Sequence, residues 1–156
     1  MSSLPYPSHA DPRRTLLASA LIGIGCMAAV DEIIFHQLLA WHHFVDRDTA
    51  FALASDGVLH AIELVLLVVG FFMMIELHGA GRQAPGYRGP GFLLGAGGFQ
   101  VFDGVVDHKI LRLHQVRYVD DLWRYDIAWI GFGVVVLAIG WLLLRRARRG
   151  HATSQH

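Results

Sequence analysis

Ionisable side chains inside an apolar stretch constrain this chain more than any other feature. About fifteen mostly apolar residues precede Asp31, and residues 31–43 (DEIIFHQLLAWHH) follow without a helix breaker. Because the apolar pattern continues past Asp31 to Phe44, the stretch is long enough to predict a membrane-spanning helix. Its continuation carries two carboxylates and three histidines. Ionisable groups at such a depth are costly, so they indicate a functional site by default.

The same arrangement recurs in the middle of the chain. In both copies histidines follow an aspartate by five and eleven residues, and an offset of 72 residues relates Asp31, His36 and His42 to Asp103, His108 and His114. The recurrence predicts two helix pairs in the same orientation. The repeat has decayed, because the second pair keeps Asp126 near the counterpart of Asp56 but has Ile130 where His60 would be.

Composition supports a membrane protein. Hydrophobic residues make up 54% of the 156 residues and charged residues 17%, against about 25% charged in a typical soluble domain. The mean hydropathy is +0.42. A net charge of zero offers no electrostatic footprint for nucleic acid. The single cysteine, Cys26, excludes an intrachain disulfide and any multi-cysteine metal site.

We therefore predict an all-α fold, an integral membrane four-helix bundle built from two decayed parallel helix-pair repeats. The expected spans are residues 14–44, 56–77, 92–116 and 126–144, within a transmembrane domain of residues 14–145. A disordered tail (1–13) should precede this domain, and a basic tail (146–156) should follow it. A signal peptide would begin similarly, but the apolar pattern continues past Asp31 to Phe44, which favours an uncleaved helix.

The arginines predict the orientation in the membrane. Most of them fall on one side of the expected spans, at Arg13, Arg14, Arg82, Arg88, Arg145, Arg146, Arg148 and Arg149. Positive charge concentrates on the cytoplasmic side of membrane proteins. Both termini should then be cytoplasmic, in a bacterial inner membrane, with the polar helix ends facing the periplasm.

Helical geometry brings many ionisable residues to one depth. At 1.5 Å and about 100° per residue, Asp56, His60 and Glu63 share a face of the second span. Ten residues are candidate metal ligands: His36, His60, Glu63, His108, His114, Asp31, Glu32, Asp103, Asp107 and Asp56. Imidazole and carboxylate on facing helices suit a first-row transition metal. Sulfur ligands are scarce, so we expect Zn, Fe, Mn or histidine-bound Cu.

Other interpretations of these residues stay open. The Asp–His and Glu–His pairs could join the helices as a structural network, or they could relay protons. Asp31, Asp103 and Asp107 could bind the metal or orient the histidines that do. Asp56 could instead cap its helix. His42 and His43 are expected near the outer surface, as interfacial residues or a metal entrance.

Three stretches resemble a known family. They are residues 31–43, the run Asp56-Gly57-Val58-Leu59-His60-Ala61, and Phe102–His108 together with His114. They are similar to bacterial four-span membrane proteins catalogued as domain of unknown function 2243, over roughly residues 15–145. The resemblance implies a four-helix fold and an inner-membrane location, and it supplies no activity. Glu32 departs from the pattern, because a glycine such as Gly104 is expected there.

The function that these patterns favour is transition-metal handling or metal-dependent redox chemistry. One alternative is a membrane-embedded zinc hydrolase, with a carboxylate as general base on a metal-bound water. Another is a proton-coupled carrier, which would need dimerisation because four spans are few. The expected partners are the lipid bilayer, a second copy of the chain, and a periplasmic or membrane redox partner. No catalytic residue is assigned.

Overall fold

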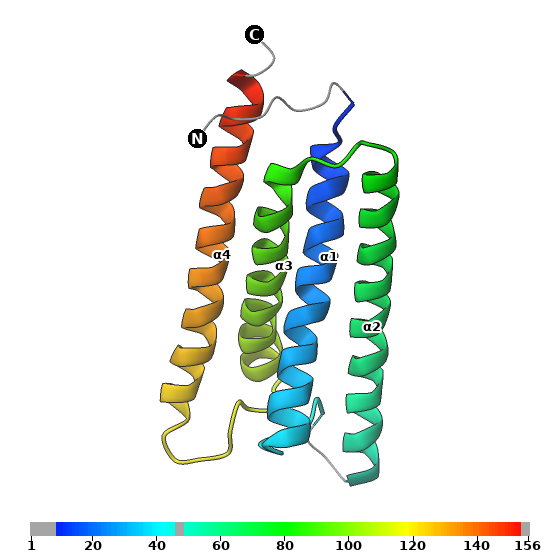
Figure 1. Ribbon diagram of the computed structural model, residues 1–156. Coiled ribbons are helices and arrows are strands. Elements are labelled where there is room, and N and C mark those ends of the chain that lie inside the picture. The colour runs from blue at the N-terminus through cyan, green and yellow to red at the C-terminus, as the bar shows by residue number, and fades with distance from the viewer. Residues whose placement is uncertain (1–8, 46–48, 154–156) are drawn as a thin grey trace.

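The structure is a computed structural model that describes residues 9–45 and 49–153 (Figure 1). Within these ranges the chain is helical and has no strand, which confirms the predicted all-α fold. Its elements are α1 (Pro12–Asp31), η1 (Glu32–Leu38), α2 (Thr49–Gly79), η2 (Pro85–Tyr87), α3 (Arg88–Phe102), η3 (Asp103–Ile110) and α4 (Leu122–Thr153). Two of the short elements, η1 and η3, are π-helical extensions of α1 and α3.

The four long helices form an open bundle in the order α2, α1, α3, α4 (Figure 1). Helix α1 packs against α2 and α3, and α3 also packs against α4. In the described part of the chain α2 makes no helix contact with α3 or α4. Helices α1 and α3 run in the same direction, and α2 and α4 run in the opposite one. The α1–α3 pair is therefore the centre of the molecule.

Glycine allows α1 and α3 to approach closely. A Cβ atom at Gly23 would collide with the carbonyl oxygen of Phe92, and a Cβ atom at Gly95 would collide with that of Ala20. The contact is reciprocal, since Gly95 lies 72 positions after Gly23 and Phe92 lies 72 positions after Ala20. Small residues commonly form such interfaces between membrane helices, where no hydrophobic effect drives association.

Three helices are long and apolar enough to cross a membrane: Pro12–Leu38, Ala50–Gly79 and Leu122–Gly150. The continuous helix of α3 and η3 lies between α1 and α4. It carries Asp103, Asp107 and Lys109, which lower its hydropathy. Three membrane-spanning helices are thus supported, and the fourth span stays a prediction.

Two of the expected spans end earlier in the structure. The first helix was expected to reach Phe44 and the third Val116, but they end at Leu38 and Ile110. The chain turns just beyond each end, at Ala40 (φ 47°) and Arg112 (φ 52°). L-residues adopt this left-handed conformation at a cost, and a helical periodicity does not predict it. The segments after these turns fold back toward the bundle instead of extending it.

The outer boundaries also differ from the expected ones. Helix α1 begins at Pro12, where Asp11 caps it by accepting a hydrogen bond from the Arg14 amide (3.0 Å). Asp11 also pairs with Arg82 (2.9 Å), so the end of the predicted tail contacts the α2–α3 connection. Helix α4 extends to Thr153 through most of the predicted basic tail. Residues 1–8, 46–48 and 154–156 lie outside the described residues.

Candidate metal centre

The backbone of α1 and α3 changes in the same way where each reaches the ionisable residues. In η1 the Leu39 amide donates to the Ile34 carbonyl (2.9 Å), and in η3 the Leu111 amide donates to the Val106 carbonyl (2.8 Å). Both bonds span five residues, as in a π-helix. Such turns often occur at functional sites because they redirect side chains. Each π-helical segment presents one histidine to the core, and the following turn returns a second one.

The returning histidines, His42 and His114, meet between the two helices. His42 Nδ1 lies 2.9 Å from the carbonyl oxygen of Val116, and His114 Nδ1 lies 2.9 Å from that of Phe44. A carbonyl oxygen only accepts, so each Nδ1 carries the proton and donates it. Each Nε2 then keeps a lone pair when the ring is neutral. The two rings stack with centroids 4.5 Å apart and planes 7° from parallel.

Three side chains of the second half form the tightest group of ligand atoms. His108 Nε2 lies 2.9 Å from His114 Nε2 and 3.2 Å from one oxygen of Asp103. The other oxygen of Asp103 is 3.5 Å from His114 Nε2. Asp103 accepts a hydrogen bond from the Trp129 indole of α4 (2.8 Å). All three side chains are buried, and we call them the second triad.

The equivalent residues of the first half, Asp31, His36 and His42, form the first triad. The rings of His36 and His42 are 4.5 Å apart and inclined at 72°, as those of His108 and His114 are 4.5 Å apart and inclined at 75°. One Asp31 oxygen is 3.8 Å from His36 Nε2. The nitrogens of His36, His42 and His114 lie within 4.8 Å of one another. Buried Nε2 atoms of His36 and His42 have no hydrogen-bond partner in residues 9–45 and 49–153.

Carboxylates surround the first triad on its α2 side. His36 Nδ1 lies 3.2 Å from Asp56 and 2.5 Å from Glu32. The partly exposed His43 also contacts Asp56 (2.6 Å). These contacts hold the His36 ring so that its Nε2 points away from Glu32 and Asp56. A carboxylate on the far nitrogen of a ligand histidine fixes the ring and raises its basicity.

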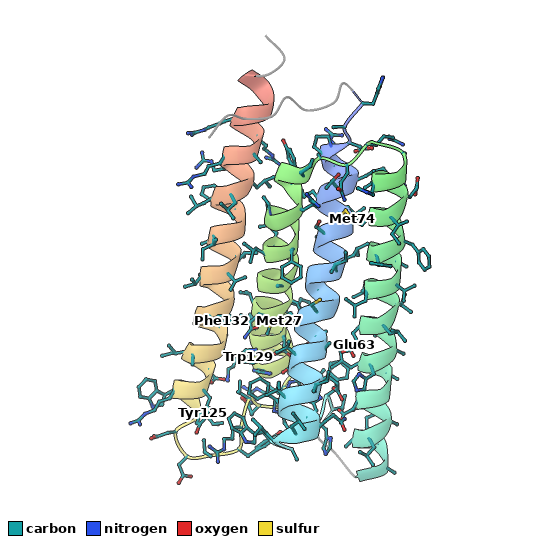
Figure 2. All side chains as sticks on the ribbon, viewed as in Figure 1. Met27, Glu63, Met74, Tyr125, Trp129 and Phe132 are labelled. Atoms are coloured by element: carbon teal, nitrogen blue, oxygen red, sulfur yellow. The ribbon has the colours of Figure 1, made fainter. Side chains whose placement is uncertain are left out.

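His60 and Glu63 lie at the edge of this cluster, on α2. Their side chains are 2.6 Å apart, and His60 Nε2 is 3.7 Å from a Glu32 oxygen. The His60 side chain is 42% exposed, whereas Glu63 is buried. Figure 2 shows Glu63 on α2 and Trp129 on α4 at a similar level, on opposite sides of the α1–α3 pair. The cluster therefore extends from Glu63 on α2 to Asp103, whose carboxylate accepts a hydrogen bond from Trp129 on α4.

The cluster contains more buried carboxyl groups than buried basic side chains that could pair with them. Six carboxylates are buried: Asp31, Glu32, Asp56, Glu63, Asp103 and Asp107. Among the residues whose burial is described, no lysine or arginine is buried. The nearby Lys109 is partly exposed and pairs with Asp126 (2.5 Å). Buried charges normally need partners or a metal ion, so this end of the bundle suits a cation.

The histidines are suited to remain neutral ligands. Burial lowers the pKa of His42 from 6.5 to about 3, and the nearby imidazoles of His114 and His36 contribute a smaller lowering through repulsion of positive charge. A neutral imidazole is the form that binds metals. His42 is thus available as a ligand at physiological pH.

The structure brings all ten predicted ligand residues to one end of the bundle, in unequal roles. His36, His108, His114, Asp31 and Asp103 face one another in the two triads. Glu32 and Asp56 flank His36, Asp107 is buried in η3, and His60 with Glu63 lies at the α2 edge. His42 was not among the ten, although the 72-residue offset pairs it with His114. His43, which contacts Asp56, was also missed.

Comparison with known proteins agrees with this architecture. No curated protein and no solved structure matches the chain. A sequence model for one family, described as "Predicted membrane protein (DUF2243)", matches residues 18–147, which include every residue of both triads. The resemblance noted from the sequence is therefore confirmed, and the chain belongs to this family of predicted membrane proteins.

Proposed function

We propose that this protein binds a transition-metal ion inside the membrane and serves in metal handling or metal-dependent redox chemistry. The observation that carries the proposal is the second triad. The Nε2 atoms of His108 and His114 are 2.9 Å apart and lie 3.2 and 3.5 Å from different oxygens of Asp103. An ion about 2.0–2.1 Å from tetrahedral ligands holds them about 3.3 Å apart. Asp103, His108 and His114 each place a donor atom within 4.8 Å of the others, which is close to the spacing that one ion requires.

The chemistry of the donors supports a first-row metal. Two imidazoles and a carboxylate suit Zn, Cu, Fe or Mn, and a set of two histidines and one carboxylate leaves open positions on the ion. Cys26, the one cysteine, lies on α1 at the wall of an apolar pocket, together with Met27 and Phe92. Thiolate and thioether ligands are therefore not part of the proposal.

Proton transport is less well supported. Every buried carboxylate and imidazole in the described ranges comes from residues 31–63 or 103–114, at the end of the bundle where α1 and α3 finish. The opposite half of the α1–α3 interface is lined by small and apolar residues such as Gly23, Ala20 and Gly95. A relay across the membrane would need titratable groups there as well.

The proposal includes an orientation. The arginine-rich end, where α1 begins and α4 finishes, would face the cytoplasm of a bacterial cell. The metal centre would then lie in the periplasmic half of the inner membrane. Metal could reach it from the periplasm without crossing the apolar part of the bundle.

Metal analysis of the detergent-purified protein tests the proposal. Mass spectrometry should find at least one Zn, Cu, Fe or Mn ion per chain after incubation with these ions. His114→Ala should lose metal, because His114 lies in the second triad and against His42. His78→Ala is the matched control, since His78 is an exposed histidine at the far end of α2. Wild-type protein that takes up none of the four metals would overturn the proposal.

A further inference from the structure

The two triads are related by a local two-fold arrangement. The carbonyls that orient His42 and His114 belong to Val116 and Phe44, so each half supplies the acceptor for the other half's histidine. All of these partners are related by the same offset of 72 residues. The axis of this arrangement runs between α1 and α3, where Gly23 and Gly95 make their reciprocal contact.

The first triad repeats several features of the second. It has an aspartate beside a π-helical histidine, and a returning histidine whose Nδ1 is held by a carbonyl. Its two Nε2 atoms, on His36 and His42, are buried and lack hydrogen-bond partners within the described ranges. Unpaired buried polar atoms are costly. Two such lone pairs on neighbouring rings are suited to bind an electrophile such as a metal ion.

We propose that a second metal ion binds at Asp31, His36 and His42, so that the protein holds a two-metal centre across the α1–α3 interface. This inference rests on the proposed function and specifies its nuclearity. The stacked rings of His42 and His114 join the two positions, and a His114 nitrogen also lies within 4.8 Å of those of His36 and His42.

Charge favours two ions over one. A single divalent cation offsets two of the six buried carboxylates, whereas two cations offset four. The two that remain, Asp56 and Glu63, each have a partly exposed histidine 2.6 Å away, His43 and His60. A two-metal centre therefore leaves no buried carboxylate of the cluster without a positive or protonatable neighbour.

The two positions are not equivalent. His36 Nδ1 has carboxylate neighbours, Glu32 and Asp56, whereas His108 Nδ1 is buried with no hydrogen-bond partner among the residues that the structure describes. In the second half Gly104 replaces Glu32, and Asp126, near the counterpart of Asp56, pairs with Lys109. Because carboxylates raise the basicity of a ligand histidine, the first triad should hold its ion more tightly. A chelator should then remove the ion of the second triad first.

Zinc counting on the full-length protein tests the inference. The detergent-purified chain is loaded with Zn(II), freed of excess zinc, and analysed for zinc per folded chain. We expect two ions in the wild type, one in His36→Ala, one in His108→Ala and none in the double variant. Asp31→Asn, which keeps the side-chain shape, replaces His36→Ala if that variant does not fold. The control His78→Ala should keep both ions, because His78 is exposed at the far end of α2, and His60→Ala tests whether the α2 edge binds an ion instead.

Each other outcome contradicts a defined part of this account. One zinc per chain in the wild type overturns the second site, and it leaves the proposed function intact. The wild type could instead bind two zinc ions, with one lost in His60→Ala and both kept in His36→Ala. This result would place the second ion at the α2 edge and overturn the assignment. No zinc, and none of the other three metals, would overturn the proposed function as well. Mn(II) loading gives an independent readout, since two ions this close should broaden each other's electron paramagnetic resonance signal.

Discussion

The imidazole rings of His42 and His114 lie face to face, 4.5 Å between centroids and 7° from parallel, although 72 positions separate them in the sequence. Each ring is held by a carbonyl from the other half of the chain. The contact joins the ends of the two central helices. Changes that disturb the ring pair or its supports should therefore affect metal binding and stability together.

The indole of Trp129 should strengthen metal binding without binding metal itself. It donates a hydrogen bond to Asp103 (2.8 Å) and so orients this carboxylate toward His108 and His114. Loss of such a supporting bond typically weakens metal affinity about 10–100-fold. Trp129→Phe should thus lower affinity in a chelator competition and leave the stoichiometry unchanged. Trp123→Phe, at a residue 58% exposed, is the control; equal affinities in both variants would mean that the indole does not orient a ligand.

Ala40 should respond to substitution in the opposite way from an ordinary helical alanine. Its φ of 47° suits glycine. Ala40→Gly should raise the free energy of unfolding by about 0.5–1 kcal/mol, whereas Ala40→Val should lower it by 1 kcal/mol or more, roughly. In α4 the exposed Ala138 gives the matched control, because Ala138→Gly should cost about 1 kcal/mol. Unfolding in mixed micelles measures these differences, and a destabilised Ala40→Gly would contradict the assigned turn.

Gly95 and Gly98 provide a sharp test of the α1–α3 contact. A Cβ atom at Gly95 collides with the carbonyl of Ala20, whereas a Cβ atom at Gly98 meets nothing within 4 Å. Gly95→Ala should destabilise the protein by about 1–3 kcal/mol through overpacking. It should also reduce metal uptake, since the helices that carry the triads move apart. Gly98→Ala should be neutral or stabilising, by up to about 1 kcal/mol. Similar effects of the two changes would argue against the close approach.

Acid should destabilise the metal-free protein partly through His42. Its pKa is lowered from 6.5 to about 3 by burial. Between these values the unfolded chain binds a proton at His42 that the folded protein excludes, so stability falls as the pH drops below 6.5. At pH 5 the lowered pKa of His42 reduces the free energy of unfolding by about 2 kcal/mol.

Comparison with His42→Gln isolates this contribution. When the pH falls from about 7.5 to 5, the free energy of unfolding of the chelator-treated wild type should drop by about 2 kcal/mol more than that of the variant. Glutamine can still donate a hydrogen bond to the Val116 carbonyl, so the loop that carries position 42 should keep its anchor. Identical pH dependence in both proteins would show that His42 takes up its proton without unfolding.

Much of the candidate site could be predicted from local sequence. The apolar stretch before Asp31 predicts a membrane helix, and Asp31, His36 and His108 lie within helical segments, as the periodicity indicates. Helical spacing also predicted that Asp56, His60 and Glu63 share a face. These features depend on residues a few positions apart, for which backbone geometry is regular.

His42 and the helix ends could not be predicted in this way. A continuous helix would carry His42 toward the outer surface, but the left-handed turn at Ala40 returns it to the core. The residue type does not predict this turn, since alanine normally continues a helix. Contacts between distant residues, such as the hydrogen bond from His42 to the Val116 carbonyl, offset the conformational cost of the turn.

The sequence by itself determined the membrane character of the chain, the helical fold, and the identity and repetition of the ionisable residues. These properties follow from the amino-acid composition and from the spacing of apolar and ionisable residues along the chain. Only the tertiary structure decided which residues meet: the close α1–α3 contact at Gly23 and Gly95, the ring pair of His42 and His114, and the placement of Asp56 beside His36. The physical reason is that packing and hydrogen bonding act between residues distant in the chain, and their free energies select the turns that local preferences leave undecided.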